Sequence, residues 1–183
     1  LRESIVAILH DTVNDKFLSI NWGANLGGSL FVGGGKEVGE DDVICATREI
    51  TEETGYTDML YSAATQTIHH HYVAHSKGVN REIKAKGLYF TLTSDTKVAP
   101  KLEANEEGKF VIEWLSREEA EKKVTDPLHK LCFDMLVKGE GYSGNGILIN
   151  SGTFNGFVSD GAKKAITEKV GGKMTSTYKL KDW

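Results

Sequence analysis

Several features that define common protein classes are scarce or missing in this 183-residue sequence. It has two cysteines, Cys45 and Cys132, which lie far apart and in no metal-like spacing, so we expect buried reduced thiols in a cytoplasmic protein. No apolar run reaches membrane-spanning length, and no signal-peptide pattern opens the chain, so no membrane partner is expected. No initiator Met is present either, and we interpret the opening LRES as the start of an excised fragment.

Positive charge is not in excess. The chain has 22 Lys and Arg against 26 Asp and Glu, which gives a formal net charge of −4. This balance disfavours non-specific nucleic-acid binding, although it leaves a local basic patch open. Hydrophobic residues make up 39% of the sequence, enough for a packed core, and the length suits one domain of ordinary size or one domain with a small appendage.

Hydrophobic periodicity predicts an α/β protein in which strands and helices are mixed. The predicted strands lie at 4–10, 16–22, 30–32, 58–63, 65–74, 83–93 and 110–115, and the predicted helices at 41–54, 116–124 and 127–138. The glycine-rich stretch GEGYSGNG at 139–146 is the clearest boundary. After it we expect a smaller strand-helix-strand segment, with strands at 146–150 and 175–183 and a helix at 159–170.

The helix predicted at 41–54 carries an unusual concentration of charge. Asp41 or Glu40 can cap its start, and Gly55 ends it. One face, expected to pack on a sheet, holds Val43, Ala46, Thr47 and Ile50. Beside that face, within an arc of about 80°, lie the carboxylates of Glu49, Glu52 and Glu53. Like charges this close repel, so the helix presents either a solvated acidic face or a site for a cation.

The spacing around these carboxylates favours the cation. The stretch reads G34-x5-E40-x7-R48-E49-I50-T51-E52-E53-T54-G55-Y56. It resembles the Nudix box, G-x5-E-x7-R-E-U-x-E-E-x-G-U, in which U is a bulky aliphatic residue, and every named polar and glycine position matches. Two departures are Tyr56 in place of an aliphatic residue and Val32 where the family often has proline. The resemblance implies an α/β/α sandwich with a mixed sheet over residues 1–140.

The same resemblance implies a chemistry. Hydrolysis of a nucleoside diphosphate linked to another moiety needs neutralised phosphate charge and an activated water, and Mg²⁺ or Mn²⁺ held by hard carboxylate oxygens supplies both. By resemblance, Glu49, Glu52 and Glu53 are the metal ligands and the catalytic carboxylates, assisted by the Gly34 carbonyl. Glu40 and Arg48 are expected to pair and to hold the loop against the helix.

Other candidate residues lie outside this motif. Family members often recruit a carboxylate from a downstream loop, and here the candidates are Glu103, Glu106 and Glu107. Glu106 or Glu107 is the favoured extra ligand among them, and a solvated acidic loop is an equal alternative. Lys77 and Arg81 are candidate substrate-binding residues, against the simpler interpretation of a solvated turn.

The aromatic and histidine candidates stay open as well. His69 and His71 share one face of a strand, where ordinary strand histidines are the favoured interpretation over a metal pair. Trp22 or Tyr72 could stack on a base, and a core or edge role is equally compatible with the sequence.

The last forty residues carry a second resemblance. GILINSGTFNGFVSDGAKKAITEKV followed by TSTYKLKDW is similar to the return segment of the editing insertion of leucyl-tRNA synthetases. The resemblance implies a Nudix module nested in that insertion, with residues 141–183 as the return segment. Two functions follow: a metal-dependent hydrolase module of the synthetase, or a non-catalytic module that positions tRNA or the editing domain. The second would depend on the basic residues Lys77, Arg81, Lys84 and Lys86.

Overall fold

The computed structural model describes residues 2–23, 28–74, 79–102, 108–139, 153 and 159–170. The chain forms two compact units, Leu1–Tyr142 and Ser143–Trp183. The second unit contributes one described helix, α4 (Ser159–Val170), at the position predicted from the sequence. The strands predicted on either side of α4 lie outside the described residues. None of the described helices is long and apolar enough to cross a membrane.

The first unit contains the predicted strands and helices with small changes at their ends, except that the strand predicted at 30–32 is divided into two. Its strands are β1 (Arg2–Asp11), β2 (Lys16–Asn21), β3 (Ser29–Leu30), β4 (Val32–Gly35), β5 (Met59–Ala64), β6 (Ile68–Ala74), β7 (Val79–Leu92) and β8 (Val111–Leu115). Its helices are α1 (Asp42–Thr54), α2 (Arg117–Lys123) and α3 (Pro127–Phe133), and a π-helical turn, η2 (Asp134–Lys138), continues α3.

Strand β1 organises a mixed sheet, as predicted. It runs parallel to β7 and antiparallel to both β2 and β4. Strands β2 and β4 pair with different parts of the same edge of β1: β2 pairs with residues 10–11 and β4 with residues 4–7. Strand β8 extends the sheet from β2, and β5 and β6 both pair with β7. Because β2 pairs only with the end of β1, the first half of that edge of β1 is paired with β4.

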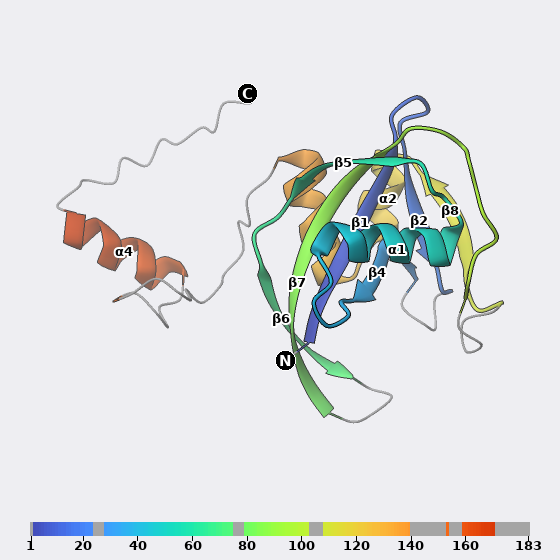
Figure 1. Ribbon diagram of the computed structural model, residues 1–183. Coiled ribbons are helices and arrows are strands. Elements are labelled where there is room, and N and C mark those ends of the chain that lie inside the picture. The colour runs from blue at the N-terminus through green and yellow to red at the C-terminus, as the bar shows by residue number, and fades with distance from the viewer. Residues whose placement is uncertain are drawn as a thin grey trace. The chain divides into compact units, whose positions relative to one another are not determined.

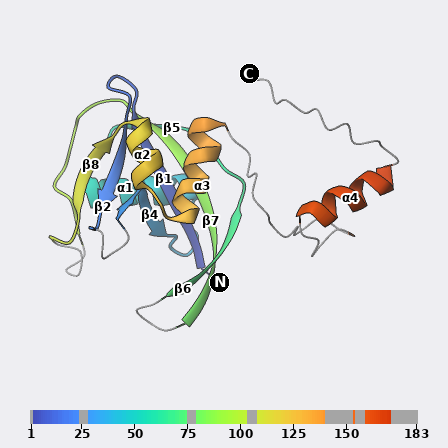
Figure 2. The same cartoon turned by 180° about the vertical axis from the view of Figure 1, so that it is seen from behind.

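The sheet lies between helices on both faces, which confirms the α/β/α sandwich (Figure 1). Side chains of β1 alternate between the two faces. Ile5, Ala7 and Leu9 pack in one core cluster with residues of α1. Val6 and Ile8 pack in a second cluster with residues of α2 and α3, which cover the opposite face (Figure 2).

Both ends of α1 are fixed by the residues predicted to fix them. The Asp41 side chain accepts a hydrogen bond from the Val43 N–H at 2.8 Å, so Asp41 is the N-cap. Gly55 ends the helix in the left-handed conformation, with φ of 81°, and its N–H donates to the Thr51 carbonyl at 2.9 Å.

The face of α1 that packs on the sheet was predicted with one error. Its buried residues are Cys45, Ala46, Ile50 and Thr54. Thr47 is only partly buried and lines a groove on the outer side of the helix. The sheet-facing stripe is therefore rotated toward Cys45, which also turns Glu49 toward β4.

Replacing Gly55 by Ala is expected to destabilise the first unit strongly. A left-handed φ costs an L-residue about 1–2 kcal/mol, and a Cβ at this position would also overlap the backbone carbonyl of Val98. Gly139→Ala is the matched control, because Gly139 also ends a helix, with φ of 68°, but a Cβ there would meet no described atom within 4 Å. We expect urea unfolding to show a larger loss for Gly55→Ala than for Gly139→Ala; equal losses would contradict the predicted overlap.

Candidate active site

Glycines of β4 bring the backbone close to a carboxylate of α1. Gly34 pairs with Ile5, whose side chain packs toward α1. A Cβ built on Gly34 would overlap the carboxylate of Glu49. Only glycine therefore lets the Glu49 carboxylate lie directly against this strand.

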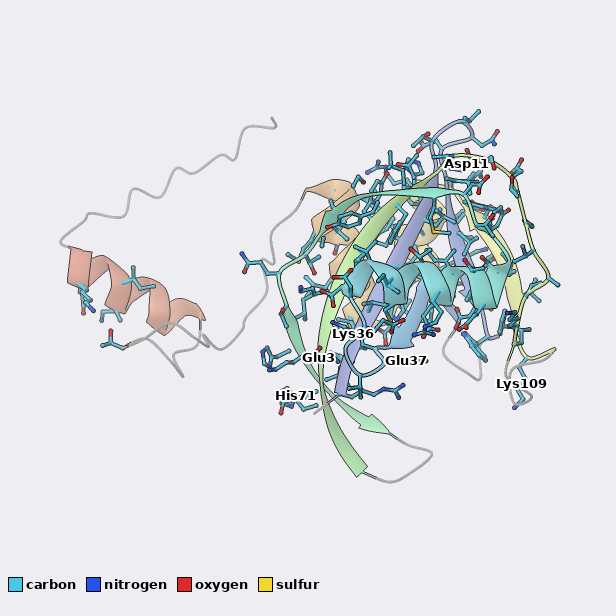
Figure 3. All side chains as sticks on the ribbon, in the orientation of Figure 1. Glu3, Asp11, Lys36, Glu37, His71 and Lys109 are labelled. Carbon is cyan, nitrogen blue, oxygen red and sulfur yellow. The ribbon has the colours of Figure 1, made fainter. Side chains whose placement is uncertain are left out.

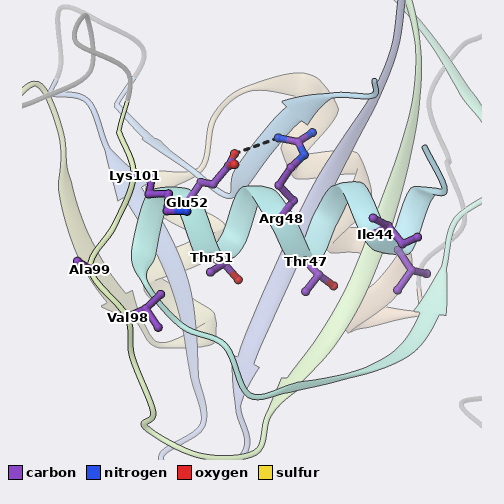
Figure 4. A pocket seen from close by; sticks show the side chains of 9 residues that line it. Ile44, Thr47, Arg48, Thr51, Glu52, Val98, Ala99 and Lys101 are labelled. Carbon is purple, nitrogen blue, oxygen red and sulfur yellow. Dashed lines mark hydrogen bonds and ion pairs between the residues drawn. The ribbon is translucent and has the colours of Figure 1, made fainter. Parts of the chain in front are cut away.

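Arg48 joins the loop before α1 to two of the helix carboxylates. Its Nε and Nη2 donate to the Glu40 carboxylate at 2.9 and 3.1 Å, and Nη2 also donates to the Gly35 carbonyl at 3.3 Å. Its Nη1 donates to Oε1 of Glu49 at 2.8 Å and to Oε2 of Glu52 at 3.0 Å, the second of which is drawn in Figure 4. One guanidinium thus lies between Glu40 and the two other carboxylates.

This arrangement shifts the pKa values of its members in different directions. Hydrogen bonds from Arg48, with help from the Glu37 backbone N–H, lower the pKa of Glu40 to about 2. Burial raises the pKa of Glu49 above its usual value, and the hydrogen bond from Arg48 only partly opposes that increase. The carboxylates raise the pKa of Arg48 further, so its charge is permanent.

Two of the three predicted ligand carboxylates share a cleft of about 940 Å³. Glu49 and Glu53 line this cleft together with Gly34. Glu52 instead lines the groove of about 490 Å³ on the outer side of α1, beside Thr51 and Lys101 (Figure 4). Arg48 is the link between the two sides, because its Nη1 bonds Glu49 and Glu52 at once.

The donor set fits a hard divalent cation. Carboxylate and carbonyl oxygens are the ligands that Mg²⁺ prefers, and the Gly34 position lets Glu49 approach the backbone as such a site needs. Arg48 uses only one oxygen of Glu49 and one of Glu52. Among the described residues no three His, Cys, Asp or Glu side chains already converge as a cluster that could hold a metal. Bringing Glu52 to the cleft would therefore require its side chain to turn away from its present position.

The loop and hairpin candidates are described only in part. Glu103, Glu106, Glu107 and Lys77 lie outside the described residues, and of Arg81 only the backbone, in β7, is described.

The histidine strand shows no metal site in the part of the chain that the structure covers. His69 Nδ1 lies 3.3 Å from Glu82 Oε1 across the β6–β7 pair, and His71 is opposite Glu82 in the register of the same two strands (His71 is labelled in Figure 3). Trp22 lines the cleft, and its ring packs on Phe110 with centroids 4.8 Å apart. The side chain of Tyr72 is not among those described.

The fold and the site geometry agree with what comparison with known proteins shows. The sequence model of the NUDIX domain matches residues 2–134. The chain belongs to the NUDIX family. Its fold is similar to that of a NUDIX hydrolase from Nitrosomonas europaea, at 22% identity and a TM-score of 0.56, covering 77% of this chain and 91% of that one. It is also similar to the E. coli dihydroneopterin triphosphate pyrophosphohydrolase, at 15% identity and a TM-score of 0.58, covering 75% and 96%.

These two structural likenesses establish the NUDIX fold and no more, because both identities are low. A curated relative matches a shorter stretch. The leucine–tRNA ligase of Rickettsia peacockii (strain Rustic) is 46% identical over 54 residues, which are 27% of this chain and 6% of that protein. The chain thus spans only a small part of the length of this relative.

Four polar residues of the NUDIX cleft were missed by the sequence analysis. Arg2, Ser4, Lys109 and His129 line the same cleft as Glu49 and Glu53. The available signal was weak: alternation along β1 places Arg2 and Ser4 on one face, but His129 sits in an ordinary amphipathic helix.

Replacing Glu40 by Gln is expected to flatten the acid limb of the stability curve. The pKa of Glu40 is lowered from 4.5 to about 2 in the folded NUDIX unit, so the ionised carboxylate stabilises the fold above pH 4.5. That contribution is lost as pH falls from 4.5 toward 2, because the unfolded state then binds the proton more readily. Urea midpoints measured across this window should depend less on pH in Glu40→Gln; an unchanged slope would contradict the assigned pairing with Arg48.

Proposed function

We propose that the chain is a NUDIX-type hydrolase that cleaves nucleoside diphosphates linked to another moiety and depends on Mg²⁺ or Mn²⁺. One observation carries the proposal: the Glu49 carboxylate lies against Gly34, at a position that a Cβ would fill, inside a cleft that Glu53 also lines. The matching spacing of the remaining motif residues and the NUDIX family assignment support it.

The carboxylates of α1 have separate tasks in this proposal. Glu49, Glu52 and Glu53, with the Gly34 carbonyl, would hold the cation, and Glu106 or Glu107 would add a further ligand. When bound, the cation neutralises phosphate charge and acidifies a water. One of the α1 carboxylates orients that water or accepts its proton. Lys77 and Arg81 would bind the phosphates of the substrate.

Arg48 and Glu40 hold this machinery in place. With Arg48 bonded to the Glu40 carboxylate and the Gly35 carbonyl, the glycine strand and α1 cannot separate without breaking charge-assisted hydrogen bonds. The bond from Arg48 to Glu49 also offsets part of the repulsion among the carboxylates. Both residues therefore position the catalytic carboxylates without touching the substrate.

A substrate panel tests the proposal. The chain is incubated with nucleoside diphosphate sugars, dinucleoside polyphosphates and nucleoside triphosphates, in Mg²⁺, in Mn²⁺ and in excess EDTA, and released nucleotide is measured by chromatography. We expect turnover of at least one compound with metal and none with EDTA. Release that persists in EDTA, or no release from any compound, would overturn the proposal.

The second candidate is a non-catalytic module that positions tRNA or the editing domain within a leucyl-tRNA synthetase. The short match to a leucine–tRNA ligase favours this context, as does the sequence pattern at 146–183. Of the basic residues invoked, Lys86 is already paired with Asp42 at 2.6 Å, so Lys84 is the better test. Absence of hydrolysis, together with tRNA binding that Lys84→Gln weakens, would favour this function over the first.

A cytoplasmic location belongs to the same proposal. Cys45 and Cys132 are both free and buried. Burial raises the pKa of each thiol to about 12, so neither is activated for reaction at neutral pH. Unreactive reduced thiols accord with a reducing compartment.

A further inference from the structure

The glycine strand β4 divides the cleft into two chemically different sides. Gly34 faces α1 and the carboxylates, whereas its neighbours face the helix layer behind the sheet. A Cβ on Gly33 would lie 3.4 Å from Cε1 of His129, and one on Gly35 would overlap the guanidinium of Arg2. The missing side chains at these two positions leave the backbone of β4 open to close approach on the α3 side.

Arg2 has no counter-ion among the residues that the structure describes. It forms no ion pair and no hydrogen bond with any residue that the structure describes. Two other cations near the glycine strand are paired: Lys36 lies 2.5 Å from Asp42, and Lys86 lies 2.6 Å from the same carboxylate (Figure 3 shows Lys36 beside Glu3). Lys109 also lines the cleft. The guanidinium of Arg2 thus lines the cleft with its five donors unused.

Ser4 follows Arg2 on the same face of β1. Its Oγ is buried, lines the cleft region, and has no hydrogen-bond partner within the described part of the chain. Buried polar groups are normally satisfied, so such a hydroxyl marks a place where a ligand or water is bound.

His129 adds a donor of fixed tautomer. Its Nδ1 accepts a hydrogen bond from the Phe31 N–H at 3.2 Å, which requires the ring proton to be on Nε2. Burial lowers the pKa of His129 to about 4, so the ring is neutral at neutral pH. Nε2–H faces the cleft beside Gly33 and donates to no described residue.

The carboxylate at the start of α3 is already engaged. Asp126 caps α3, where its Oδ1 accepts from the backbone N–H groups of Leu128 and His129 at 2.9 and 3.1 Å. The α3 side of the cleft therefore offers three side chains that can donate hydrogen bonds, one of them a permanent cation, opposite the carboxylates of α1.

We propose that Arg2, Ser4 and His129 bind a terminal phosphate carried by the part of the substrate that is not cleaved. The proposal rests on the proposed function, since it concerns a diphosphate substrate whose scissile link lies at the carboxylates. The guanidinium can bind two oxygens of a terminal phosphate at once, and the hydroxyl of Ser4 and the Nε2–H of His129 can donate to the acceptor positions that remain. Substrates would then be chosen by a second phosphate remote from the diphosphate.

Binding without turnover tests this directly. Affinities are measured by calorimetry in EDTA for two matched pairs, NAD⁺ with NADP⁺ and dephospho-coenzyme A with coenzyme A, whose members differ by one ribose phosphate. In at least one pair we expect the phosphorylated member to bind about 10- to 100-fold more tightly. Arg2→Gln should abolish that preference and leave the affinity for the other member unchanged, while Arg2→Lys should retain part of it.

Arg117→Gln is the matched control, because Arg117 is exposed and, within the described ranges, donates only to the Val137 carbonyl at 3.1 Å. No preference in either pair, including no measurable binding of any member at millimolar concentration, overturns the inference. So does a preference that Arg2→Gln leaves intact. Because the calorimetry is done in EDTA, hydrolysis does not contribute to the measured affinities. The substrate panel tests the proposed hydrolysis independently, so failure of one proposal can be distinguished from failure of the other.

Discussion

Glu53→Gln is expected to lower kcat by about 10²- to 10⁴-fold, the range typical of a lost general acid–base or metal-bound carboxylate. Glu53 lines the cleft beside Glu49 and Gly34, and Gln keeps its shape while removing the charge. The thermal unfolding midpoint should stay close to that of the parent chain. Steady-state kinetics on whichever compound the substrate panel identifies, with circular dichroism melts alongside, measure both.

Glu52→Gln tests whether the effect depends on where the carboxylate lies and not only on the loss of a carboxylate from α1. Glu52 has the same chemistry but lines the outer groove, with 38% of its side chain exposed and one oxygen bonded to Arg48. We therefore expect a smaller loss of kcat than in Glu53→Gln, and none in the surface control Glu118→Gln, whose carboxylate pairs with Lys122. Turnover unaffected in both helix variants would contradict the assigned roles, and a larger loss in Glu52→Gln would place Glu52 at the reacting atoms.

Gly34→Ala is expected to cost about 100-fold in activity with little loss of stability. The new Cβ would occupy the place of the Glu49 carboxylate and force it to move. A displacement of about 1 Å at a catalytic group typically lowers the rate by about 100-fold. The fold should tolerate the change, because the displaced atoms are the far end of a flexible side chain.

Gly33→Ala provides the comparison for Gly34→Ala. Its Cβ would meet His129 at 3.4 Å, on the side of β4 away from Glu49. Metal-dependent hydrolysis of a substrate without a second phosphate should therefore survive Gly33→Ala. Equal losses of activity in the two variants would show that the glycines are needed for the structure of β4 as a whole and not for the close approach of Glu49.

Features set by local patterns were predictable from the sequence. The caps Asp41 and Gly55 depend on residues within a few positions of the ends of α1. A long motif with fixed spacing identified the family before any tertiary contact was known. The predicted strand at 30–32 was less accurate, since the chain breaks at Phe31 into β3, which pairs with β2, and β4, which pairs with β1.

Features set by tertiary register were not predictable. A helical wheel gives the spacing of an apolar stripe but not its rotation against a sheet, and Thr47 was placed on the wrong side for that reason. The group formed by Arg2, Ser4 and His129 is brought together only by the pairing of β1 with β4 and by the packing of α3. The bonds from Arg48 to Glu49 and Glu52 likewise depend on how long side chains settle in three dimensions.

Mn²⁺ titration followed by electron paramagnetic resonance tests the central claim most directly, because it detects the cation site whether or not a substrate is known. For the parent chain we predict saturable binding that Mg²⁺ displaces, and for Glu49→Gln and Glu53→Gln a clear loss of affinity. Glu118→Gln should bind as the parent does. Absence of saturable binding, or equal binding by the parent and the two cleft variants, would contradict a cation site formed by these carboxylates beside Gly34.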